Sequence, residues 1–209
     1  MSTPPSFKLT VFPARAAARA VILRRGPTRM FHVISWNMAT DRFEHGSWFR
    51  GRIFEESCDI SPDGRYFRYV ACNGSHKTRE RIGFNAWVAI CRPPRLTALS
   101  MTVCIGTWHV RSHFVTATDP EFSTAFSDPC LPRRLRLSFE PRPEPKPWKV
   151  VPAVENADWV GINSDGQLIY TIGSQVWRCS NRNGKLQAPK LIADFSDLVP
   201  PWQTSQRAE

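Results

Sequence analysis

Two stretches of this chain repeat one pattern, and that repeat limits the possible folds more than any other feature. Residues 59–70 read DISPDGRYFRYV and residues 161–172 read GINSDGQLIYTI, so the two stretches align without a gap. The alignment matches Ile60 with Ile162, Asp63 with Asp165, Gly64 with Gly166 and Val70 with Ile172. An Asp-Gly pair supplies the positive φ angles of a tight turn, so each stretch predicts two β-strands joined as a hairpin.

The distance between the two hairpins predicts how many such units the chain holds. Their Asp-Gly pairs are about 100 residues apart, which is roughly two repeats of about 40–50 residues each. We therefore expect one all-β domain over residues 1–209, built from about four irregular four-stranded units in a β-propeller-like arrangement. The expected units cover about residues 7–49, 57–105, 106–140 and 157–195, with an extended proline-rich spacer at 140–149.

The first of the two stretches resembles a known family. The run DISPDGRY at 59–66 is similar to the strand–turn–strand signature of Tol-type and WD-repeat-like β-propellers. The units lack the Gly-His opening and the Trp-Asp ending of WD repeats. Residues 20–70, with RRGP at 24–27 and WFRGR at 48–52, are similar to uncharacterised bacterial proteins with propeller-like repeats. The resemblance implies a fold and carries no known activity.

A second interpretation places the two hairpins in another all-β architecture, such as a sandwich or a barrel. Four units make a small propeller, and an open stack of sheets leaves strand edges exposed to pairing. A homodimer would cover such edges, so the hypothesis includes an incomplete ring or a ring closed by dimerisation. The 18 prolines and 11 glycines favour short elements over long helices in all of these architectures.

The charge of the chain points to a protein partner or another anionic partner. The formal net charge is +10, and arginine far outnumbers lysine. Arginine binds carboxylates and phosphates through a planar fork, and arginine and tryptophan are favoured anchors in protein interfaces. We therefore predict a non-enzymatic binding module. The predicted contact residues are Arg24, Arg25, Trp48, Arg50, Arg52, Arg92 and Arg95.

Two other functions remain open at this point. Nucleic-acid binding is the first, because WFRGR at 48–52 interleaves aromatic rings that stack on bases with arginines that neutralise phosphates. A hydrolase with an unrecognised site in a propeller-type pocket is the second. The chain has no P-loop, no nucleophile elbow and no HExxH motif. We expect no catalytic residue and no cofactor.

The cysteines and histidines supply one weak metal candidate. Cys91, Cys104, His109 and His113 are of types that suit zinc, but their spacing is not that of a zinc finger. Two residues four apart on a straight strand lie about 13 Å from each other, too far to share one ion. We therefore predict no metal site and mostly buried free thiols. We also expect a cytoplasmic protein without a membrane span, because the apolar runs are short and no signal peptide is recognised.

Overall fold

The structure is a computed structural model that describes residues 7–26, 29–104, 112–139, 154–182 and 185–204. These residues form a mainly β protein, as expected. The helical segments among them are short: α1 (His76–Ile82), α2 (Pro201–Thr204) and the 3-10 turns η1 (Glu55–Ser57) and η2 (Pro120–Ser123). Everything else of regular structure is strand, arranged in antiparallel sheets.

The first sheet is a four-stranded antiparallel meander. Its strands follow one another along the chain as β1 (Lys8–Pro13), β2 (Arg19–Arg25), β3 (Met30–Asn37) and β4 (Arg42–Arg50). The inner strand β2 is buried from Ala20 to Arg24 because other elements pack on both of its faces. This double burial explains its continuous apolar run, where a strand with one solvated face would alternate.

The second sheet has five strands. In spatial order it contains β5 (Arg52–Ile53), β7 (Phe67–Cys72), β8 (Ala86–Cys91) and β9 (Ala98–Cys104), and β6 (Asp59–Ile60) pairs with β7 beside β5. Thus β5 and β6 share one edge of β7, with η1 between them in the chain. The predicted range 57–105 holds four of these strands, β6 to β9, and β5 adds a fifth strand from just before that range.

The third sheet has two strands, and the fourth has four. The third consists of β10 (His113–Thr116) and β11 (Leu135–Ser138). The fourth consists of β12 (Trp159–Ile162), β13 (Leu168–Ile172), β14 (Gln175–Cys179) and β17 (Lys190–Asp194), with the small hairpin β15 (Asn181–Arg182) and β16 (Lys185–Leu186) between β14 and β17 in the chain. Among the described residues, the expectation of four strands is therefore wrong for the third unit, and the second sheet exceeds it only through β5, which lies outside the predicted range.

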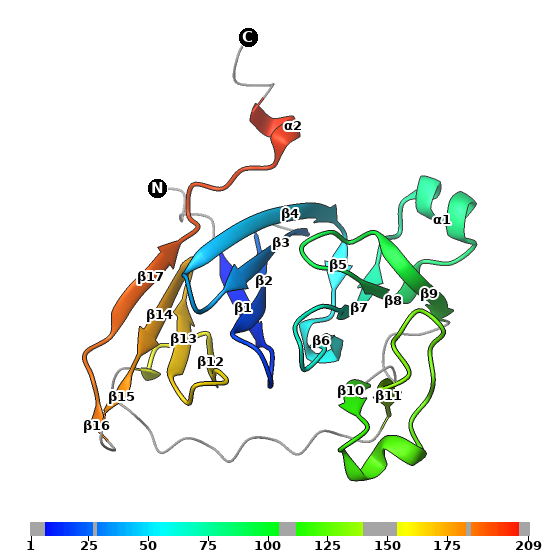
Figure 1. The fold of residues 1–209 in the computed structure, drawn as a ribbon. Helices are drawn as coiled ribbons and strands as arrows, with labels where there is room; N and C mark the ends of the chain where they lie inside the picture. Colours follow the sequence, from blue (N-terminus) through cyan, green and yellow to red (C-terminus); the bar gives the residue numbers. More distant parts are fainter. Residues whose placement is uncertain (1–6, 27–28, 105–111, 140–153, 183–184, 205–209) are drawn as a thin grey trace.

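The sheets lie side by side in the order fourth, first, second and third (Figure 1). Apolar side chains fill the space between each neighbouring pair. Ile22 and Ile169 belong to the cluster between the first and fourth sheets, and Val33 and Phe67 to the cluster between the first and second. Ile90 and Phe114 belong to the cluster between the second and third sheets, so the core consists of successive layers.

Both Asp-Gly pairs form the predicted hairpin turns. Gly64 and Gly166 each have a φ of 72°, a left-handed value that favours glycine. The first turn joins β6 to β7 and the second joins β12 to β13. The registers differ by one residue, because Ile60 pairs with Phe67 whereas Ile162 pairs with Leu168. The ungapped alignment is therefore correct at the turns and shifted by one in the returning strands.

Candidate functional site

Five of the seven predicted contact residues fall into two groups. Arg25 and Arg50 end β2 and β4 of the first sheet, and Arg52 follows closely as the first residue of β5; we call these three residues the end cluster. Arg92 and Arg95 lie on the loop between β8 and β9, in the second sheet. Residues that were predicted to contact one partner therefore lie on two separate parts of the structure.

Arg24 is the one predicted contact residue that has no exposed surface. Its guanidinium donates to the carbonyl oxygens of Phe195 at 2.9 Å, Gly26 at 3.2 Å and Ser196 at 3.4 Å. It also lies 4.0 Å from the centre of the Phe7 ring. These contacts tie the first sheet to the chain that follows β17, so Arg24 acts inside the fold.

Trp48 belongs to a stack of rings on β3 and β4. Its ring lies 4.2 Å from the ring of His32, and His32 stacks in turn on His45. The Nε2 of His32 is 3.1 Å from Nδ1 of His45. Burial lowers the pKa of His32 to about 4, with the neighbouring His45 acting in the same direction. His32 is therefore neutral near pH 7, and Trp48 is half-buried against it.

The end cluster is only partly neutralised. Arg25 forms an ion pair with Glu55 at 3.5 Å, and the guanidinium of Arg52 lies 4.7 Å from the ring centre of Phe54. Both arginines are exposed. Arg29 lies in the same region, because its carbonyl accepts a hydrogen bond from Gly51 at 2.8 Å. The end cluster is thus a solvated basic patch.

A cavity of about 330 Å³ lies between the first and second sheets, and sequence reasoning did not predict its residues. Arg19, Asn37 and Arg42 line it from three adjacent strands, and register pairs Arg19 with Asn37 and Asn37 with Arg42. Directly paired residues project from the same face of a sheet, so these three side chains point together toward the second sheet. We call this set the arginine rung.

The arginine rung carries uncompensated positive charge. Within the part of the chain that the structure describes, neither Arg19 nor Arg42 has a hydrogen bond or an ion pair from its side chain, and both are exposed. Glu44 also lines the cavity without an ion pair among those residues. The site therefore offers two arginines against one carboxylate, with a side-chain amide between the arginines.

The opposite wall of the cavity is Gly64 and Pro93 of the second sheet. The loop that carries Pro93 is fixed against β4, because Ser47 donates its backbone N–H to the Pro94 carbonyl at 3.0 Å. Gly46 permits this approach, since a Cβ there would lie 2.1 Å from the Pro94 oxygen. The predicted contact residue Arg92 directly precedes this wall, so this loop places it next to the cavity lined by the arginine rung.

Trp36 forms part of the cavity wall and is held rigidly. Its indole N–H donates to Asp41 at 3.3 Å, and Asp41 also pairs with Arg178 of the fourth sheet. The guanidinium of Arg178 lies 5.5 Å from the ring centre of Trp36. These contacts join the first and fourth sheets and hold the strands that carry the arginine rung in place.

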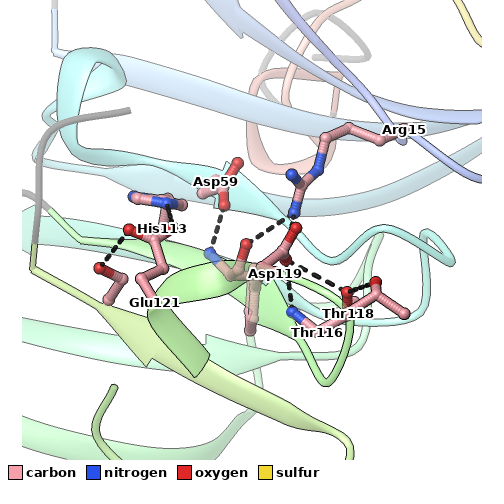
Figure 2. A network of polar contacts seen from close by, with 9 residues as sticks. Arg15, Asp59, His113, Thr116, Thr118, Asp119 and Glu121 are labelled. Carbon is pink, nitrogen blue, oxygen red and sulfur yellow. Dashed lines mark hydrogen bonds and ion pairs between the residues drawn. The ribbon is translucent and has the colours of Figure 1, made fainter. Parts of the chain in front are cut away.

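A polar network joins the second and third sheets to the loop between β1 and β2 (Figure 2). Asp59 accepts the backbone N–H of Phe114 at 2.7 Å, and Arg15 pairs with Asp119 at 3.6 Å. His113 and Ser138 both contact the carboxylate of Glu121, at 2.9 Å and 3.2 Å. Because the carboxylate lies between the imidazole and the hydroxyl, this geometry does not activate the serine as a nucleophile.

The residues of the weak metal candidate are not brought together. Register pairs Cys91 with Ala98 and Cys104 with Ala86, so the two thiols lie at opposite ends of the β8–β9 ladder. His113 is engaged by Glu121, and His109 lies outside the described residues. No group of three or more His, Cys, Asp or Glu side chains in the described ranges could hold a metal ion.

Raised pKa values make poor nucleophiles of the thiols of Cys91, Cys104, Cys130 and Cys179. Burial raises the pKa of Cys91 to about 12, and it raises the pKa of Cys130 to about 12 with help from the nearby Asp128. Burial also raises the pKa of Cys104 and Cys179. A reactive cysteine needs a lowered pKa, so these four thiols stay protonated near neutral pH.

Comparison with known proteins does not place this chain. No family model, no curated protein and no solved structure matches it. Among the described residues, no helix has the length and apolar character needed to cross a membrane. The predicted cytoplasmic location and the predicted homodimer stay predictions.

Proposed function

We propose that this protein is a non-enzymatic binding module that recognises an acidic segment of a partner protein, with the arginine rung as its central contact. The observation that carries the proposal is the alignment of Arg19 and Arg42 on one face, without a partner for either side chain among the described residues. Arginine pairs with carboxylates in a bidentate geometry. The cavity of about 330 Å³ beside them can admit an acidic side chain.

The arrangement of the sheets supports a scaffold role for the rest of the chain. We propose that the four sheets form an irregular β-propeller-like stack. In support, edge strands of neighbouring sheets touch, since β12 contacts β1, β1 contacts β6 and β6 contacts β10. Sheets arranged around one axis with one edge of each sheet innermost are the pattern of a propeller, whose loops and cavities commonly carry the binding surface. A crystal structure with β10 separated from β6 would contradict this arrangement.

A titration with labelled acidic peptide tests the binding proposal. The probe is a fluorescein-labelled peptide rich in Glu and Asp, and the control peptide has Gln and Asn at the same positions. Anisotropy should report binding of the acidic peptide only. The double variant Arg19→Ala/Arg42→Ala should weaken it by about tenfold or more, since hydrogen bonds to charged groups contribute about 1.5–3 kcal/mol each.

The matched control removes two charges elsewhere. Arg81 and Arg133 are exposed and lie away from the cavity lining, so Arg81→Ala/Arg133→Ala changes the net charge equally. We expect less than about a threefold loss from this control, because exposed charge pairs contribute about 0–1 kcal/mol. Equal losses in the two double variants would show a general charge effect and would overturn the assignment to the arginine rung.

Nucleic-acid binding is a second candidate, supported by the end cluster. Arg25, Arg50 and Arg52 gather there, close along the chain to the half-buried Trp48. A single-stranded DNA probe in the same assay distinguishes the two functions, because each phosphate contact steepens the dependence of affinity on salt. Tight DNA binding that is steeply lost with salt, and that survives Arg19→Ala/Arg42→Ala, would favour this candidate over the first.

A further inference from the structure

A second cavity, of about 230 Å³, lies between the second and third sheets. Val88 and Ile90 line it from β8, and Leu137 lines it from β11. Phe126 forms another wall, held in place because its backbone exchanges two hydrogen bonds with Leu137, at 2.8 Å and 3.0 Å. Phe126 is 55% exposed, so this apolar wall reaches the surface. The cavity is therefore mostly apolar and preformed.

The side-chain hydroxyl of Ser112 is a polar group of this cavity that has no hydrogen-bond partner among the described residues. Ser112 lines the cavity at only 8% exposure, and its hydroxyl oxygen is buried without a partner among the described residues. Its own carbonyl is used elsewhere, as the acceptor of a hydrogen bond from Arg68 at 3.4 Å. A buried hydroxyl without a partner destabilises a protein, so a ligand that supplies one gains specific affinity there.

The two charged side chains of the cavity, Arg68 and Asp128, already have partners within the protein. Arg68 donates to the Ser57 carbonyl at 2.6 Å and lies opposite the acidic Asp59 on the neighbouring strand β6. Asp128 accepts from the Ser100 hydroxyl at 2.7 Å and from the Cys130 backbone at 2.9 Å. Burial tends to raise the pKa of Asp128, but these hydrogen bonds outweigh it and keep the pKa below its usual value. A charged ligand thus has no uncompensated charge to pair with.

We propose that this cavity binds a small, uncharged, mostly apolar molecule that carries one hydrogen-bonding oxygen, with that oxygen paired to the Ser112 hydroxyl. Phenols and short alcohols have this chemistry. The volume of about 230 Å³ is below the roughly 300–1,000 Å³ of sites for drug-sized ligands, which limits the occupant to a single ring or a short chain. The site is separate from the arginine rung, so its occupancy does not depend on the proposed partner.

The test compares two ligands of the same shape on the full chain labelled with ¹⁵N. The probe is 4-methylphenol, and the reference is 1,4-dimethylbenzene, which has a methyl group in place of the hydroxyl. We expect saturable shifts of the backbone amides of Ile90 and Leu137 with 4-methylphenol and weaker binding of the reference. An absence of saturable shifts in β8 and β11 would overturn the proposal.

Ser112→Ala then assigns the oxygen contact. It should weaken 4-methylphenol by about threefold to tenfold, the effect of one hydrogen bond, and leave the affinity for the hydrocarbon within about twofold. The control Ser123→Ala, at an exposed position outside the cavity, should change neither affinity. The midpoint of urea unfolding of Ser112→Ala should be unchanged or higher. A lower midpoint, or equal weakening of both ligands, would show a structural role and refute the assignment.

Discussion

The two Asp-Gly turns permit a direct test of how alike the repeated hairpins are. Gly64 and Gly166 have the same φ of 72°, but their surroundings differ. A Cβ added at Gly64 would lie 2.7 Å from the Cβ of Arg19, whereas a Cβ at Gly166 would meet nothing within 4 Å. Replacement of each by alanine therefore isolates the backbone conformation in one case and adds a steric clash in the other.

The expected losses of unfolding free energy follow from this difference. An L-residue in the left-handed region costs about 1–2 kcal/mol, and that is the whole effect expected for Gly166→Ala. Gly64→Ala adds the cost of overpacking, about 1–3 kcal/mol, because the Cβ of Arg19 is fixed to β2 and cannot rotate away. The total expected for Gly64→Ala is about 2–5 kcal/mol. The clash should also displace Arg19 from the arginine rung.

Urea unfolding followed by tryptophan fluorescence measures both losses. The slope of the unfolding free energy against urea should stay constant, since neither change alters the surface exposed on unfolding. Gly74→Ala is the matched control, because Gly74 has no positive φ and a Cβ there would meet nothing within 4 Å. That control should be neutral or stabilising by about 0.4–1 kcal/mol. Equal losses for Gly64→Ala and Gly166→Ala would refute the packing of the first turn against β2.

Two further predictions concern buried basic side chains. Because the pKa of His32 is lowered to about 4 from an unfolded value of about 6.5, the unfolded chain binds more protons in that window. Stability should therefore be complete above about pH 6.5 and should fall toward pH 4, by less than about 1.4 kcal/mol per pH unit for this group. Urea midpoints between pH 7 and 4 should show a flatter slope in His32→Phe than in the parent, and parallel slopes would contradict this. Arg24→Met should lower the unfolding free energy by about 2–4 kcal/mol, since three carbonyls lose their donor. Arg25→Met, which replaces the exposed neighbouring arginine, should lower it by less than about 1 kcal/mol. Similar losses in these two variants would show that the buried contacts of Arg24 do not stabilise the fold.

Arg19 links the candidate site to the turn at Gly64. This residue begins β2, packs against the turn at Gly64 and lines the cavity between the first and second sheets. The hairpin that the repeat predicts therefore serves as one wall of the candidate site. Gly64→Ala should therefore weaken peptide binding and also lower the unfolding free energy. Gly166→Ala, at the equivalent turn of the fourth sheet, should lower only the unfolding free energy.

Local features were predictable from the sequence because their causes are local. The two turns need only an Asp-Gly pair and a hydrogen bond across the turn, from Gly64 to the Ser61 carbonyl and from Gly166 to the Asn163 carbonyl. The strands of the first sheet were predictable for the same kind of reason, since short β-type runs alternate with turn residues along the chain. The mainly β class followed from these signals together.

The number of strands in each sheet was not predictable in the same way. The third sheet has two strands. The second sheet has five, because β5 and β6 share one edge of β7. The one-residue difference between the two hairpins also has no signal in the ungapped alignment, where both turns look identical. Pairing across strands depends on partners that are distant in the chain, so sequence spacing alone could not supply it.

By itself, the sequence determined the hairpin turns, the abundance of short strands and the excess of arginine, since each depends on residue type and on near neighbours. Only the tertiary structure decided which arginines are available. Arg24 and Arg25 are adjacent in the chain, yet one is buried against carbonyls of residues 195 and 196 and the other is solvated. Arg19 and Arg42 come together because β3 lies between their strands in register. The physical reason is that a side chain's surroundings are set by the sheet packing around it, and that packing joins residues far apart in the sequence.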